Sequence, residues 1–279
     1  MPVPLNLSQR FLEAQRGRVR NLGEMPAGEK LGTLRILRRY PFKSMAGEDI
    51  HEAFVSYAGL SGDRAYAFVD RNNHTNFPWM TARQSHEMLL FRPRYLEGPS
   101  ASNEHPAQAS FALEVVTPEG EKFNPADFGF TPFFEKRFGR PLELRFSERA
   151  MQDGCPVSLL GLDTVKALSE EAGVPVEHTR FRANFYIEWE NGKPYYEDEL
   201  VGTSLRIGEK FTFTLVQNDM RCAIITLDPK TGEASPEIGK LIAKNHGNCF
   251  GVYGSVLREG IVRQGDAVFS FAGTRVKGI

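Results

Sequence analysis

Cysteine, net charge and long apolar runs are all scarce in this sequence. The 279 residues include only three cysteines, Cys155, Cys222 and Cys249, too few for a disulfide framework, so we expect a reducing, cytoplasmic compartment. The formal net charge is −1, which gives no reason to expect a nucleic acid partner. No apolar run approaches the roughly 20 residues of a spanning helix, so we expect no membrane anchor.

Several common site motifs are also missing. The sequence has no G-x-x-x-x-G-K-[ST] phosphate loop, no strand–GxGxxG–helix fingerprint, no H-E-x-x-H and no CxxC pair. Its histidines are scattered singly, which argues against a zinc site built from several of them. Any recognition of an anion must therefore come from a local group of basic residues.

The pattern along the chain predicts many short strands, glycine-rich turns and few helices. This mixture favours a mainly β fold with added helices (α+β), arranged as two barrel-like β subdomains. Helices are expected over Asp127–Phe138, along the stripe from Leu159 to Leu168, and over Pro236–His246. Strands are expected over Leu34–Arg39, Ile50–Tyr57, Ala65–Asp70, Met88–Leu96, Phe111–Thr117, Leu142–Phe146, Phe185–Trp189, Leu205–Ile207, Phe211–Val216, Ala223–Leu227, Val252–Leu257 and Ala267–Phe271.

Two short polar segments of the first half could bind an anion. Tyr40–Gly47 follows a strand and carries Lys43 and Ser44, which offer an ammonium, a hydroxyl and backbone N–H groups. Gly59–Arg64 places a guanidinium where a turn becomes a strand, and Thr81-Ala-Arg-Gln84 follows some twenty positions later. Taken alone, the Tyr40–Gly47 segment is better explained as a solvated turn, and a structural turn at Asp63-Arg64 would explain the second segment.

Two further segments belong to the second half. Arg180–Asn184 is a basic, amide-bearing step into a strand, and Arg221-Cys222 places a thiol beside a guanidinium before the turn-prone stretch Asp228-Pro-Lys-Thr-Gly232. A neighbouring arginine would lower the pKa of the thiol and favour the thiolate, which is the metal-binding form. A lone cysteine at a strand start is, however, more often a small buried apolar residue.

Taken together and in order, these segments are similar to those of one family. YPFKSMAG, GLSGDRAYAFVD, TARQ, RFRAN, RCAIITLDPKTG and FGVYGSVLREGIVRQGD resemble MOSC-domain proteins that also have a MOSC N-terminal β-barrel domain. The resemblance is greater to the mitochondrial amidoxime-reducing components and their bacterial relatives than to short stand-alone MOSC proteins. It runs from about residue 33 to residue 271 and implies an N-terminal extension (1–32), a MOSC N-terminal β domain (33–147) and a MOSC β-barrel domain (148–279).

The resemblance implies a site for the molybdenum cofactor, Mo-molybdopterin. Cys222 matches the cysteine that ligates molybdenum. The positions implied to hold or line the cofactor are Lys43, Ser44, Arg64, Gly154, Cys155, Arg182, Asn184, Arg221 and Tyr253. The chain departs from the family at Ala183, where a proline is usual, and at Cys155, which puts a second thiol close to the expected pocket.

The same resemblance implies a molybdenum-dependent oxidoreductase that reduces N-hydroxylated substrates, such as amidoximes and hydroxylamines, by two electrons. Because no flavin or iron–sulfur motif is evident, the electrons are expected from a separate protein of the ferredoxin, cytochrome b5 or flavoprotein reductase type. A non-catalytic carrier of the cofactor or of sulfur, with Cys222 as acceptor, is the alternative. A cysteine hydrolase with His178 or His246 as base is a third hypothesis, for which the sequence offers no motif.

Overall fold

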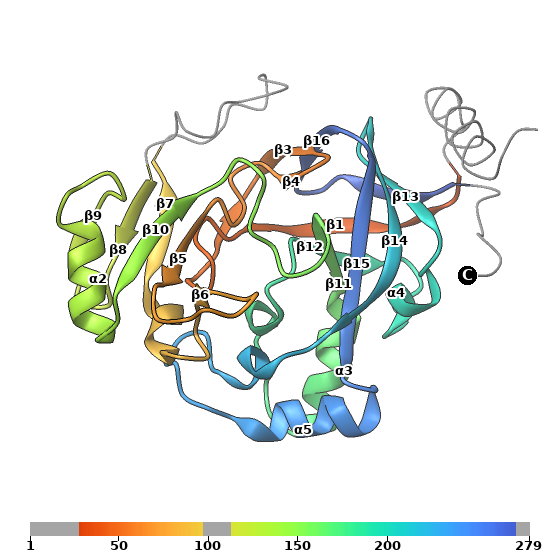
Figure 1. Ribbon diagram of the computed structural model, residues 1–279. Helices are drawn as coiled ribbons and strands as arrows, with labels where there is room; N and C mark the ends of the chain where they lie inside the picture. Colours follow the sequence, from red (N-terminus) through yellow and green to blue (C-terminus); the bar gives the residue numbers. More distant parts are fainter. Residues whose placement is uncertain (1–27, 97–112, 272–279) are drawn as a thin grey trace, which may run out of the picture.

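A computed structural model describes residues 28–96 and 113–271 of the chain. Its main feature is a closed barrel of seven strands, in which the first strand of the chain pairs with strands on both sides (Figure 1). β1 is antiparallel to β12, with Leu37 opposite Phe185, and antiparallel to β17, with Thr33 opposite Ala267. In barrel order the strands are β12 (Phe185–Trp189), β11 (Val157–Gly161), β15 (Cys249–Arg258), β14 (Phe211–Met220), β13 (Ser204–Ile207), β17 (Ala267–Ser270) and β1 (Lys30–Arg39).

The barrel holds the largest apolar core of the molecule. Large side chains such as Leu34, Phe185 and Phe213 are fully buried and pack together inside it. Burial alternates along the middle of β15, as expected for strands with one face toward a core. The mainly β, α+β class expected from the sequence is therefore confirmed, with the barrel as its centre.

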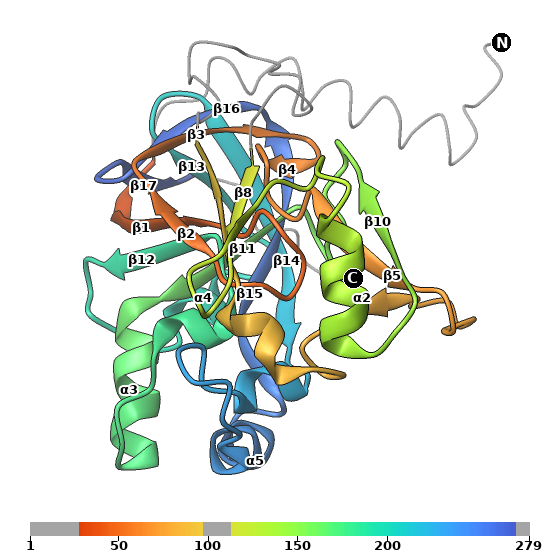
Figure 2. The same ribbon diagram turned by 90° about the vertical axis from the view of Figure 1, so that its left-hand side faces the viewer.

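A second core lies between two small sheets and a helix from the first half of the chain. It is rich in phenylalanine, and the rings of Phe42, Phe68 and Phe134 pack with centroids about 5 Å apart. Figure 2 shows helix α2 (Phe130–Phe138) beside this region. The two sheets are β10 (Leu142–Phe146) with β5 (Tyr66–Asp70) and β6 (Trp79–Met80), and β7 (Arg92–Tyr95) with β8 (Leu113–Val116) and β9 (Lys122–Phe123). A third small sheet, β16 (Gly260–Arg263) with β3 (Glu52–Ser56) and β4 (Gly59–Leu60), packs on the barrel core instead.

Strand pairings at two places join the first and second halves of the chain. β1 lies in the barrel of the second half, and β16 pairs with β3, placing Val262 opposite Ala53. β2 (Glu48–Ile50) extends the barrel sheet at the edge of β1. The division at residues 147 and 148 stays a prediction, and residues 1–27 of the expected N-terminal extension lie outside the described part of the chain.

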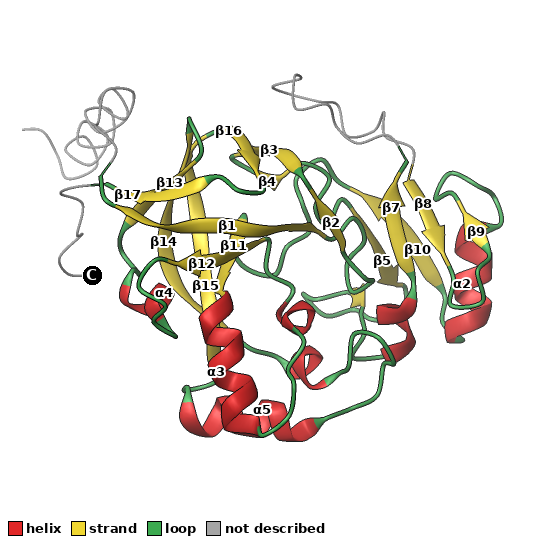
Figure 3. Cartoon of the chain, turned by 180° about the vertical axis from the view of Figure 1, so that it is seen from behind, coloured by secondary structure: helices red, strands yellow, loops and turns green. Residues whose placement is uncertain are grey.

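Helices cover one end of the barrel (Figure 3). α3 (Leu162–Ala172) and α5 (Pro236–Asn245) pack on a third core that includes Leu168, Ile242 and Phe250. The remaining helical segments are short: α4 (Tyr196–Glu199) and the 3-10 helices η1 (His86–Leu90), η3 (His178–Phe181) and η4 (Ala223–Thr226). Among the described residues, none of the helices combines the length and the apolar character needed to cross a membrane.

Three sequence-based assignments of secondary structure were wrong. Ala223–Leu227 forms η4 instead of a strand, because its apolar Ile225 turns into the core under α5. Met88–Leu96 divides into η1 and β7. The expected helical stripe begins too early, since Leu159 lies in β11 and the helix starts only at Leu162.

Candidate functional site

A cavity of about 600 Å³ lies where loops of the first half meet the extended ends of the barrel strands. It brings together seven of the predicted site residues: Lys43, Ser44, Arg64, Arg182, Arg221, Cys222 and Tyr253. The other residues that line it are Asn73, Thr75, Phe77, Thr81, Arg83, Gln84, Asp153, Ser158, Phe181, Asp219, Met220, Ile224 and Ile225. The motifs are therefore adjacent in space although they are distant in sequence.

The loop after β1 holds Lys43 in a buried position. Phe42 anchors the loop in the aromatic core and forms a bridge with Tyr66, and the Lys43 N–H donates to the Tyr66 carbonyl at 2.8 Å. Lys43 Nζ donates to the carbonyl of Met151 at 2.8 Å and to Asp153 Oδ1 at 2.5 Å. Burial lowers the pKa of Lys43; Asp153 opposes this effect, and two nearby guanidinium groups add to it. The ammonium is thus held in a region that already has excess positive charge.

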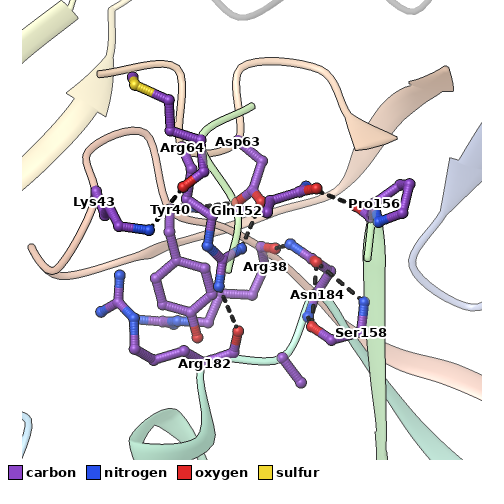
Figure 4. A network of polar contacts seen from close by, with 12 residues as sticks. Arg38, Tyr40, Lys43, Asp63, Arg64, Gln152, Pro156, Ser158, Arg182 and Asn184 are labelled. Carbon is purple, nitrogen blue, oxygen red and sulfur yellow. Dashed lines mark hydrogen bonds and ion pairs between the residues drawn. The ribbon is translucent and has the colours of Figure 1, made fainter. Parts of the chain in front are cut away.

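Those guanidinium groups belong to Arg64 and Arg182, which gather around the ring of Tyr40 (Figure 4). Their Cζ atoms lie 4.7 and 4.3 Å from the ring centroid, at cation–π distance. Arg64 Nη2 donates to the carbonyl of Arg182 at 2.9 Å, and Arg64 also pairs with the buried carboxylate of Asp63. Both arginines have a positive φ, 47° and 54°, so each turn is held in the left-handed region by these contacts.

Arg182 differs from Arg64 in having a donor without a partner. Arg182 Nη1 donates to the carbonyl of Met45 at 2.6 Å, but Nη2 is buried and, within the described residues, meets no acceptor. Burial, followed by the charge of Arg64, lowers the pKa of Arg182 to about 10. A buried cation with an unused donor is the part of this cavity best suited to an anion.

Cys222 lies at the end of β14, just before η4, and its side chain is exposed in the cavity. Arg221 holds this segment in place: its Nε donates to the Phe250 carbonyl at 2.7 Å, and its Nη1 donates to the Phe181 carbonyl at 2.9 Å. Arg221 Nη1 also lies 2.8 Å from Asp219 Oδ2. These contacts engage the guanidinium with groups other than the thiol. Activation of the Cys222 thiol by Arg221 therefore stays a prediction.

Three predicted site residues do not line the cavity. Asn184 is buried behind it, where its amide donates to the Arg38 carbonyl at 3.2 Å and accepts from Ser158 at 3.3 Å. A Cβ on Gly154 would lie 2.9 Å from the Tyr253 ring, so only a glycine fits under this tyrosine. Cys155 is partly buried, and burial raises the pKa of its thiol. These residues support the lining rather than form it.

Sequence reasoning missed the role of two carboxylates. Asp153 precedes the predicted site residues Gly154 and Cys155 and pairs with Lys43. Asp219 was not singled out, yet it is buried in the lining, hydrogen-bonded to Tyr253 and paired with Arg221. Burial raises the pKa of Asp219. The one available signal was an acidic residue at the end of a strand, which is common in any protein.

The lining excludes two kinds of site. Among the described residues, no three His, Cys, Asp or Glu side chains lie close enough together to hold a metal ion by themselves. Neither candidate base of a cysteine hydrolase lines the cavity: His178 packs on the Tyr186 ring, and His246 lies 3.0 Å from Glu171 Oε2 beside Tyr195. The cavity instead offers one thiol, together with cations suited to an anionic ligand.

Two family models match most of the chain. Residues 31–128 match the model of the MOSC N-terminal beta barrel domain, and residues 147–269 match the MOSC domain. Among solved structures, the chain is similar to the YuaD protein from Bacillus subtilis at 11% identity, covering 86% of this chain and 95% of that one, with a TM-score of 0.46.

YiiM from Geobacillus stearothermophilus is similar at 18% identity, covering 41% of this chain and 53% of that one, with a TM-score of 0.33. No curated protein matches the chain. MOSC domains are associated with proteins that bind the molybdenum cofactor. On the two domain matches, which together span most of the described residues, the chain belongs to the MOSC-domain proteins with a MOSC N-terminal beta barrel domain.

Proposed function

We propose that this protein binds the molybdenum cofactor and catalyses the two-electron reduction of N-hydroxylated compounds. The observation that carries the proposal is the shared cavity, in which the exposed thiol of Cys222 lies with the buried cation Lys43 and with Arg182, whose Nη2 is buried. A soft thiolate suits a molybdenum centre, and clustered cations suit the phosphate of its organic part.

The donor set fits the cofactor on a specific structural point. Arg182 Nη2 is buried and finds no acceptor in the part of the chain that the structure describes, which is costly unless a ligand supplies one. Lys43, Ser44 and Arg182 would hold the anionic part, and Cys222 would hold the metal. Arg64 and Arg221 are engaged with the backbone and with carboxylates, so their role is to keep those groups in position.

When bound, the cofactor supplies the two-electron redox change, and the protein supplies orientation and electrostatics. The N–O bond of an amidoxime breaks, two electrons and two protons are taken up, and an amidine and water leave. In this scheme Cys222 stays bound as a ligand. Lys43 and Arg182 keep the anionic end fixed, so that the substrate meets the same face of the site in each cycle.

The electrons are proposed to come from a separate redox protein of the ferredoxin, cytochrome b5 or flavoprotein reductase type. Cys222 is exposed, and the adjacent Met220 side chain is 73% exposed, so this edge of the cavity is accessible to a partner. An artificial reductant should therefore replace the partner in an assay.

The test is turnover by the cofactor-loaded protein with a reduced dye as electron donor. We expect one amidine for every two electrons consumed, and loss of both turnover and bound molybdenum in Cys222→Ala. Cys249→Ser, which changes a thiol on β15 outside the cavity lining, is the matched control and should retain both. If the loaded protein reduces no N-hydroxylated compound, the proposed activity is wrong.

The exposed thiol also suits the carrier function. A carrier would show a reversible persulfide on Cys222 without reducing any N-hydroxylated compound. Mass spectrometry before and after cyanide treatment, performed on the same preparation as the turnover assay, separates the two functions.

A further inference from the structure

The proposed function leaves one arginine of the cavity unused. Arg83 is exposed, lines the same cavity as Cys222 and belongs to the Thr81–Gln84 segment. This segment joins β6 to η1, whereas Cys222 joins β14 to η4. A ligand in the cavity can therefore touch residues from both halves of the chain.

The segment around Arg83 is held in a fixed shape. Gln84 Oε1 accepts from the Thr81 N–H at 2.9 Å and from Thr81 Oγ1 at 2.6 Å, and the Gln84 N–H donates back to the Thr81 carbonyl at 2.9 Å. Ala82 is fully buried. The backbone that carries Arg83 is thus ordered before any ligand binds, which lowers the entropy cost of binding.

The guanidinium of Arg83 lies over the ring of Phe77, with its Cζ 4.7 Å from the ring centroid. Stacking of this kind covers one face of the guanidinium. Its Nε donates to Thr81 Oγ1 at 3.5 Å, which leaves the two Nη groups to meet a ligand. Phe77 also lines the cavity, so a planar apolar group and a cationic edge are presented side by side.

Arg83 is distinguished from most other cations of the cavity by its lack of a carboxylate partner. Lys43, Arg64 and Arg221 are paired with aspartates, whereas over residues 28–96 and 113–271 neither Arg83 nor Arg182 is within an ion pair. Arg182 Nη2 is buried, but Arg83 is exposed. Arg83 is therefore placed to meet a ligand that enters from solvent.

We propose that Arg83, stacked on Phe77, selects N-hydroxylated substrates that carry a carboxylate on a planar ring. The inference rests on the proposed function and adds a substrate class to it. A small anionic substrate is favoured over an acidic protein surface because Arg83 lies within the cavity lining beside an apolar ring. The fork of the guanidinium matches a carboxylate in a bidentate contact.

The test compares an aromatic amidoxime with its ring-carboxylated analogue, using the cofactor-loaded protein and a dye reductant so that no protein partner is present. We expect kcat/KM to favour the carboxylated compound by about tenfold in the wild type, and this ratio to fall to about one in Arg83→Gln. Arg83→Lys should retain part of the preference. Arg92→Gln, which changes an exposed arginine on β7 outside the cavity lining, should retain all of it.

A binding measurement separates failure of the inference from failure of the proposed function. Calorimetry with the two amidine products should show tighter binding of the carboxylated amidine to the wild type than to Arg83→Gln, whether or not turnover occurs. Equal binding of both products by the wild type would overturn the inference while leaving the reductase proposal intact. A loss of bound molybdenum in Arg83→Gln as large as that in Arg182→Gln would also overturn it, since Arg83 would then hold the cofactor.

Discussion

The carboxylate of Asp153 lies 2.5 Å from the ammonium of Lys43 and is the counter-ion of that buried cation. The two partners differ in exposure: the side chain of Asp153 is 58% exposed, while that of Lys43 is 5% exposed. Asp153 can thus move into solvent at low cost, whereas Lys43 cannot. An incoming anion would take over the position of this carboxylate.

Replacing Asp153 with asparagine should strengthen the binding of anions in the cavity. Without its counter-ion, Lys43 should bind inorganic phosphate roughly fivefold more tightly, which corresponds to about 1 kcal/mol for a partly exposed ion pair. Phosphate titration followed by calorimetry measures the change. Glu148→Gln removes an exposed carboxylate outside the lining and is the control; an equal gain in both variants would show only a change in net charge.

The pH dependence of stability should reveal the buried ammonium of Lys43. Burial lowers its pKa below the ordinary 10.5, so the folded state binds this proton less tightly than the unfolded state does. The free energy of unfolding therefore gains a contribution that rises with pH, from the lowered pKa up to 10.5.

Lys43→Met lacks this contribution. Urea unfolding at a series of pH values should show the wild type gaining stability relative to the variant over that range. Lys240→Met, a change at an exposed lysine on α5, is the control. A difference between wild type and Lys43→Met that stays constant as pH rises would contradict a destabilised buried cation.

Arg182→Gln should weaken the stabilisation of the protein by phosphate. In the wild type, the buried Nη2 gains an acceptor when an anion binds, so phosphate raises the melting temperature by an amount that grows with the logarithm of its concentration once this exceeds the dissociation constant. The variant lacks that donor and should show less than half of the rise. Thermal unfolding in phosphate and in chloride at equal ionic strength measures this, with the exposed Arg145→Gln on β10 as control.

Gly251→Ala should destabilise the barrel next to the site. Gly251 has φ +79°, and a Cβ there would lie 2.9 Å from the carbonyl oxygen of Leu159 on β11. We expect the free energy of unfolding to fall by about 2–3 kcal/mol, because the variant combines backbone strain with a steric clash. Gly247→Ala, at φ +58° with open space around it, should lose only about 1 kcal/mol. Equal losses of unfolding free energy in the two variants would mean that the Leu159 carbonyl moves away from the added Cβ without cost.

The motifs of the sequence lie together in space, whereas periodicity misassigned some of the elements around them. Residues near Lys43, Arg64, Arg182 and Cys222 meet in one cavity, as their resemblance to a family implied. The β-branched stretch after Cys222, in contrast, became a 3-10 helix. Its Ile225 side chain is buried, and the segment contacts α5 and η3. A single-sequence pattern contains no information about those distant segments.

The relation between Arg221 and Cys222 shows a second limit of prediction from the sequence. Because the two residues are adjacent in the sequence, we expected the guanidinium of Arg221 to act on the thiol of Cys222. At the end of a strand, however, successive side chains point to opposite faces, so Asp219 and Arg221 turn inward while Met220 and Cys222 turn outward. The outward thiol is available to a ligand because this alternation of burial continues for two residues beyond Met220, the last residue of β14.

Closure of the barrel depends on a pairing between strands at opposite ends of the described chain, since β1 meets β17 with Thr33 opposite Ala267. During synthesis on a ribosome, β1 emerges early but has no partner on that side until β17 has followed. Because long-range pairing of this kind slows folding, the seam between β1 and β17 should be among the last parts to become protected from hydrogen exchange. An unpaired β1 edge is also where a nascent chain would be most open to pairing with another copy.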